Sequence, residues 1–172
     1  SWVVLYARGI THERLQEWDK AESDFRNALT INPDQANVLN YLGYSLIDRG
    51  EKLDEAMTMI EKAVRLQPES GYIVDSLAWG LFKLGKYETA IPHMEKAAEL
   101  MPVDPIVMDH LGDLYWAVGR QLEAKFQWRR ALSFDPELND APRIREKLRI
   151  GLDRVLVNEG LKPTSELYAN DK

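Results

Sequence analysis

The stretch from Gly71 to Asp104, GYIVDSLAWGLFKLGKYETAIPHMEKAAELMPVD, is the unit from which most of this chain is built. Two runs of residues recur in it at helical spacing. The first run holds Leu77, Ala78 and Leu81, and the second holds Tyr87, Ala90, Met94 and Ala97. Gly85 separates the two runs, and Pro102 lies after the second. This pattern predicts two antiparallel helices that are joined by a tight turn.

Residues of the same kind recur along the chain at steps of 34 or 35 residues. In the first predicted helix of each copy, the small residues are Gly9, Gly43, Ala78 and Gly112. In the second, the alanines are Ala21, Ala56, Ala90 and Ala124, and the terminating prolines are Pro33, Pro68, Pro102 and Pro136. Several independent sets of residues share this one spacing, which indicates four copies of one structural unit.

This pattern resembles the tetratricopeptide repeat (TPR), a helix-turn-helix unit of about 34 residues, here of the bacterial multi-repeat type. The best matches are Met108, Leu111, Gly112, Tyr115, Ala124, Ala131 and Pro136 in the last copy and Leu39, Leu42, Gly43, Ala56 and Pro68 in the second. The resemblance implies an all-α fold, a right-handed superhelical solenoid of four units within 1–138. The unit boundaries are expected near 2–35, 36–70, 71–104 and 105–138.

Residues 139–160 are predicted to form a C-terminal capping helix, because the last of a set of stacked repeats needs its apolar side covered. The apolar stripe of this helix is Ile144, Leu148, Leu152, Val155 and Leu156. Its other face carries Arg143, Arg145, Lys147, Arg149 and Arg154. That face is interpreted as solvated, with a partner-binding patch as the alternative. Residues 161–172 are expected to form a frayed tail.

The composition is that of a soluble globular protein, with 45% hydrophobic and 29% charged residues. A net charge of -6 argues against nucleic acid as a partner, since phosphate binders carry clustered cations. The absence of cysteine excludes disulfides and thiolate sites. No membrane insertion is expected, and both the cytoplasm and a bacterial periplasm or envelope stay open as compartments. The chain begins with Ser1 inside the first predicted helix, so the N-terminus is expected to be truncated.

No motif for catalysis is present in the sequence. The three histidines, His12, His93 and His110, lie in three different copies. The nearest metal or acid-base candidate is His110 with Asp109 and Asp113 on one predicted helix, and we favour ordinary polarity there over a site. We therefore expect no catalytic residue, no metal, no cofactor and no enzyme activity.

In the TPR family, the first helices of successive units line a concave face that binds extended peptides or partner helices. Helical phase places the predicted partner-binding groove at Asn37, Asn40, Tyr44, Tyr72, Asp75, Trp79, Phe82, Asp109, Asp113 and Trp116. Aromatic side chains are frequent anchors at protein interfaces. Together with the aspartates, they predict a protein or peptide partner that is apolar and neutral-to-basic. The cations with which some family members hold a C-terminal carboxylate are missing, so that specificity is not expected.

The sequence thus predicts a protein-protein interaction module that binds an extended or helical segment in the concave groove. Two alternatives stay open. The first is a non-catalytic accessory region of a larger enzyme or envelope assembly factor. The second is a self-association module that forms homo-oligomers through exposed repeat ends.

Overall fold

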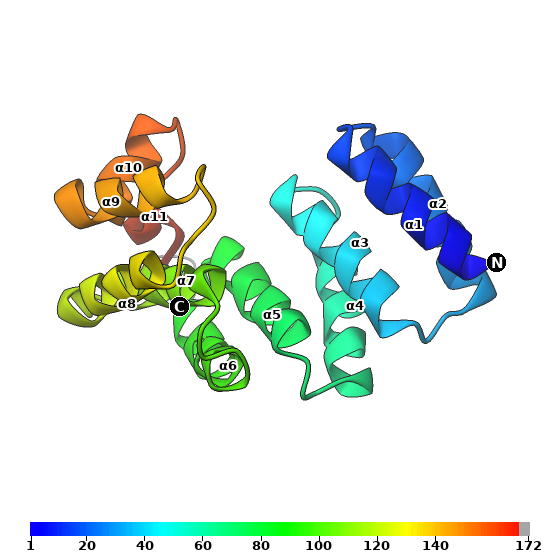
Figure 1. The fold of residues 1–172 in the computed structure, drawn as a ribbon, viewed down its shortest axis with the longest axis horizontal. Helices are drawn as coiled ribbons and strands as arrows, with labels where there is room; N and C mark the ends of the chain where they lie inside the picture. The colour runs from blue at the N-terminus through cyan, green and yellow to red at the C-terminus, as the bar shows by residue number, and fades with distance from the viewer. Residues whose placement is uncertain (169–172) are drawn as a thin grey trace. The chain divides into compact units, whose positions relative to one another are not determined.

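The computed structural model describes residues 1–168, and these residues form helices and no strands. The helices follow one another as antiparallel pairs, as Figure 1 shows for α1 with α2 and for α3 with α4. The chain divides into two units, Ser1–Glu69 and Ser70–Lys172. The all-α class predicted from the sequence is confirmed.

Unit 1 contains two helix pairs, α1 (Trp2–Arg14) with α2 (Trp18–Ile31) and α3 (Ala36–Asp48) with α4 (Leu53–Leu66). Each pair crosses closely at a glycine. A Cβ atom on Gly9 would lie 2.6 Å from a ring carbon of Phe25, and one on Gly43 would lie 2.6 Å from a side-chain carbon of Ile60. The recurring small residue is therefore required by the distance between the paired helices.

Unit 2 repeats this arrangement in α5 (Gly71–Lys83) with α6 (Tyr87–Leu100) and α7 (Pro105–Ala117) with α8 (Gln121–Ser133). Asp104 caps α7, because its carboxylate accepts hydrogen bonds from the backbone N–H groups of Ile106 and Val107. Gly112 lies against Trp128, where an added Cβ would be 2.5 Å from the indole. Helices in equivalent positions thus pack in equivalent ways.

Three further helices follow, α9 (Ala141–Ile150), α10 (Leu152–Asn158) and α11 (Thr164–Tyr168). The sequence predicted one helix over 139–160, but Gly151 divides it, with a φ of 85° that L side chains rarely adopt. Part of the expected frayed tail forms α11, in which Thr164 is buried. The rest of that tail, 169–172, lies outside the described residues. No helix among the described residues is both long and apolar enough to span a membrane.

Candidate interaction surface

We call α5 and α7 the inner helices of unit 2. Residues 34 positions apart occupy equivalent repeat positions on these helices. They are Tyr72 and Ile106, Asp75 and Asp109, Trp79 and Asp113, and Phe82 and Trp116. The structure separates these positions by burial. Tyr72 is 67% exposed and Ile106 is 47% exposed, whereas the later positions of α5 are buried. The inner face of unit 2 therefore has an open part and a closed part.

Trp79 belongs to the closed part because it is stacked between two rings. Its indole lies 4.4 Å from the ring of Phe82 and 3.8 Å from the ring of His110, with interplanar angles of 6° and 12°. Phe82 also contacts Tyr87 of α6. The sequence analysis placed Trp79 and Phe82 in the partner-binding groove, but helix packing buries both, and α7 supplies the histidine that faces Trp79.

A buried polar pair joins the two inner helices. His110 Nδ1 lies 2.8 Å from Asp75 Oδ1, and both side chains are about nine-tenths buried. Burial, the largest influence, lowers the pKa of His110, but Asp75 together with Asp109 and Asp113 outweighs it and raises that pKa overall. Asp75 is therefore occupied by an internal partner in this structure.

The cation that the sequence analysis assigned to a partner protein is supplied by α9. Lys147 Nζ lies 2.8 Å from Asp109 Oδ1 and 2.8 and 2.9 Å from the two carboxylate oxygens of Asp113. Trp128 Nε1 also donates to Asp113, at 3.0 Å. The interpretation of Lys147 as part of a solvated basic face is wrong, because its side chain is 0% exposed.

The C-terminal helices also cover the end of α7. The indole of Trp116 lies beside Gly151 and donates to Asp153 at 3.3 Å. Asp153 in turn accepts hydrogen bonds from the backbone N–H and the hydroxyl of Thr164, at 2.7 and 2.6 Å. The hydroxyl of Tyr87 donates to the backbone carbonyl of Thr164 at 3.0 Å. The chain's own C-terminal segment thus closes the C-terminal half of the inner face in unit 2.

Sequence reasoning missed the part played by Lys147, Asp153 and Thr164. A signal for Lys147 was present, because it lies three residues after Ile144 and one before Leu148, within the apolar stripe of the predicted helix. The contacts of Asp153 and Thr164 join residues eleven positions apart across a loop. No periodic pattern reports such a contact.

Unit 1 holds the remaining predicted groove residues. Asn37 is exposed, while Asn40 and Tyr44 are half-buried. The side-chain oxygen of Asn40 is buried and has no hydrogen-bond partner among the described residues. Nearby on the same helix, Tyr41 donates to Glu13, whose pKa is raised, chiefly by burial.

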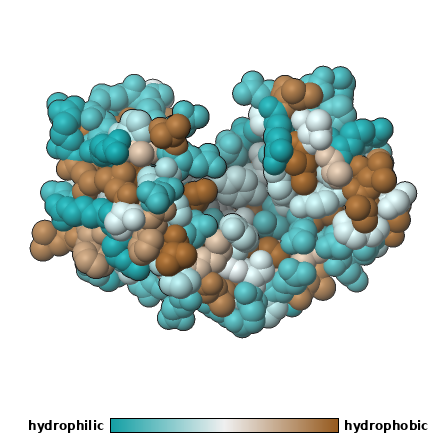
Figure 2. All heavy atoms as spheres, viewed as in Figure 1, coloured by the Kyte–Doolittle hydropathy of each residue, from teal (hydrophilic) through white to brown (hydrophobic). Residues whose placement is uncertain are grey.

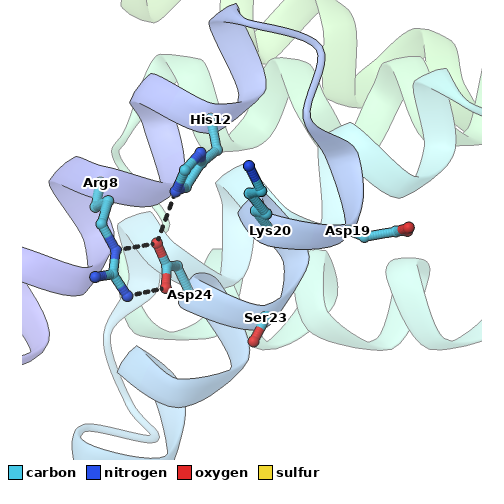
Figure 3. Close-up of a pocket in the computed structure, with 6 residues that line it drawn as sticks. All are labelled: Arg8, His12, Asp19, Lys20, Ser23 and Asp24. Carbon is cyan, nitrogen blue, oxygen red and sulfur yellow. Dashed lines mark hydrogen bonds and ion pairs between the residues drawn. The ribbon is translucent and has the colours of Figure 1, made fainter.

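An open pocket of about 390 Å³ lies between α1 and α2 (Figure 3), lined by Arg8, His12, Asp19, Lys20, Ser23 and Asp24. The sequence signal for it is Arg8, which stands where the other copies have leucine. Its guanidinium makes two hydrogen bonds of 2.7 Å to the buried carboxylate of Asp24 and lowers the pKa of that group. His12 lies 3.8 Å from the same carboxylate and 2.6 Å from Glu17. The two lining cations and two lining acids balance, so the pocket favours no charged ligand of either sign.

Metal binding has no geometric support in the part of the chain that the structure describes. No group of three or more His, Asp or Glu side chains there is arranged to hold an ion. The candidate trio His110, Asp109 and Asp113 is instead divided between two internal partners, Asp75 and Lys147.

Comparison with known proteins identifies the repeat. The family model for the tetratricopeptide repeat matches residues 1–136. The TPR repeat-containing protein PA4667 of Pseudomonas aeruginosa is 36% identical over 110 residues, which are 64% of this chain and 18% of that protein. The BBSome complex member BBS4 of Bos taurus is 29% identical over 93 residues, which are 54% of this chain and 18% of that protein. The matched region thus spans less than a fifth of either relative.

The fold is also found in solved structures. A tetratricopeptide repeat protein from Parabacteroides merdae superimposes with a TM-score of 0.74 and 19% identity, over 98% of this chain and 70% of that one. At this level of identity, the likeness shows the fold alone.

Proposed function

Because this chain belongs to the tetratricopeptide repeat family, we propose that it is a protein-interaction module that holds a partner segment on the open part of its inner face. The observation that carries this proposal is the exposure of Tyr72 and Ile106. These two large side chains occupy the same repeat position on α5 and α7. One partner segment that crosses the two helices contacts both.

Tyr72 and Ile106 differ from the residues that follow them on the same helices. Trp79 and Phe82 are 9% and 6% exposed, so their contribution is to the packing of unit 2. An exposed tyrosine and an exposed isoleucine at the same repeat position supply contact area at low ordering cost, which is typical of anchors at protein interfaces. The proposed anchors are therefore Tyr72 and Ile106 in the first turns of α5 and α7, in place of Trp79.

The partner segment is proposed to be apolar and neutral-to-basic. Asp109 follows Ile106 by three residues, which places it on the same side of α7. Its side chain is 18% exposed and already contacts Lys147. A lysine or arginine of the partner that faces Asp109 therefore increases the association rate of the complex more than its affinity.

The proposal is tested with a photo-crosslinking amino acid at position 72 of the full-length protein in its source cells. The protein captured there is then purified, and its affinity is measured for wild type and for Tyr72→Ala. We expect Tyr72→Ala to weaken binding by about 1–2 kcal/mol and to leave the circular dichroism spectrum unchanged, because Tyr72 is mostly exposed.

Val103→Ala is the matched control, since Val103 is 63% exposed and lies in the loop between α6 and α7. Wild-type affinity in Tyr72→Ala and in Ile106→Ala, with both variants folded, would remove the binding site from the inner face of unit 2.

Self-association is a second candidate, favoured by the exposed apolar side chains at the start of α1. Val3 and Val4 are 52% and 64% exposed and adjacent in sequence. A dimer through this surface predicts a sedimentation coefficient that rises with protein concentration. It also predicts that Val4→Glu keeps the protein monomeric.

A further inference from the structure

The outer face of α8 exposes two large apolar side chains. Leu122 is 85% exposed and Phe126 is 58% exposed. Residues four apart on a helix are neighbours on its surface, so the two side chains form one continuous patch. Figure 2 shows hydrophobic side chains on the α8–α9 side of unit 2.

The other second helices of the repeat show that the fold does not require apolar residues here. The position of Leu122 holds Asp19 in α2, Asp54 in α4 and Glu88 in α6. The position of Phe126 holds Ser23, Thr58 and Pro92. All six of these counterparts are exposed. The patch is therefore specific to α8 within this chain.

The charge of α8 also differs from that of its counterparts. Three cations and one acid lie on α8, whereas α2 and α4 each carry two cations and three acids, and α6 carries one cation and three acids. Arg130 lies over the ring of Phe126 at 5.9 Å, and Arg129 is exposed. The acid of α8, Glu123, pairs with Arg120. The patch is therefore apolar with a cationic border.

We propose that this patch, Leu122 and Phe126 with Lys125, Arg129 and Arg130, docks an acidic amphipathic helix of a protein partner. Two apolar side chains spaced along one helix fit apolar residues three or four apart on another. Acidic residues beside them complement the cationic border. A second copy of this chain fits less well, because a two-fold contact brings two copies of the cationic border together and supplies no additional acid.

The proposal is tested by selecting a displayed library of helical peptides on the whole chain. The selected pool is then counter-selected on the double variant Leu122→Glu/Phe126→Thr. This variant carries the residues that α6 and α4 have at those positions, so the repeat accommodates them. Leu15→Glu is the matched control, because Leu15 is 65% exposed and lies in unit 1.

We expect clones that bind wild type and Leu15→Glu but not the double variant, with Asp or Glu beside their apolar residues. The corresponding free peptide should bind Arg129→Glu about tenfold more weakly than wild type and should lose affinity as salt rises. The proposal is overturned if no clone discriminates against the double variant or if discriminating clones lack acidic residues. It is equally overturned if the double variant abolishes a concentration-dependent dimer of the wild type, which would make a second copy the occupant.

Discussion

Replacing Lys147 by methionine tests whether a buried charge holds the C-terminal helices on α7. Methionine keeps most of the side-chain length and removes the cation. Lys147 contacts Asp109 and Asp113 at 2.8 Å, and its side chain is 0% exposed. Removing one member of a buried ion pair leaves the other charge uncompensated, which costs about 3–5 kcal/mol.

Asp113 accounts for most of this cost because its side chain is 2% exposed, whereas that of Asp109 is 18% exposed and can be solvated. In the variant, Asp113 loses both bonds from Lys147 and keeps the hydrogen bond from Trp128. Burial, the largest influence, already raises the pKa of Asp113, and Lys147 opposes that rise. Without Lys147 the folded-state pKa moves further above the unfolded value. The variant therefore regains stability as the pH falls through that pKa, and its deficit relative to wild type narrows in acid.

The free energy of unfolding is measured by urea denaturation at neutral and acidic pH, followed by circular dichroism. Lys147→Met/Asp113→Asn is the rescue variant, because asparagine removes the buried charge and can still accept from Trp128. Arg145→Met is the surface control, since Arg145 is exposed on the same helix. A loss for Lys147→Met of less than about 0.5 kcal/mol, equal to that of Arg145→Met, would refute the reasoning.

Two further predictions concern the packing of unit 2. Ala124→Leu should destabilise the protein by about 1–3 kcal/mol, because Ala124 is 0% exposed where α8 crosses α7. An unchanged melting temperature would show that the larger side chain fits at this crossing without strain. The second concerns His110, whose pKa is raised above 6.5, because Asp75 and the neighbouring acids outweigh the effect of burial. The stability that its protonation contributes is complete below 6.5 and is lost as the pH rises through the folded value. His110→Gln should remove this pH dependence, which urea unfolding across that pH range measures. An equal slope of the free energy of unfolding against pH in both proteins would contradict the prediction.

The predicted groove residues show that helical phase predicts the side of a helix on which a residue lies but not its burial. Phase alone placed Tyr72, Asp75 and Trp79 on one side of α5, and it gave no means of separating them. The structure separates them, because His110 of α7 contacts Asp75 and Trp79, whereas Tyr72 is 67% exposed. A residue's face follows from its own helix, whereas its burial depends on the helix opposite.

The sequence by itself determined the repeat, the helix pairs and the small residue at each close crossing, which is Gly9, Gly43, Ala78 or Gly112. These features are local, since they depend on residue spacing and on side-chain size at fixed positions. Figure 1 shows the paired helices that this spacing predicts.

Only the tertiary structure decided which part of the inner face in unit 2 is open. That depends on Gly151, where a φ of 85° ends α9 and lets α10 and α11 return toward α7. α9 itself holds Lys147 against Asp113, and the return after Gly151 places Asp153 beside Trp116. These contacts join residues that are more than thirty positions apart, and the repeat pattern contains no information about them.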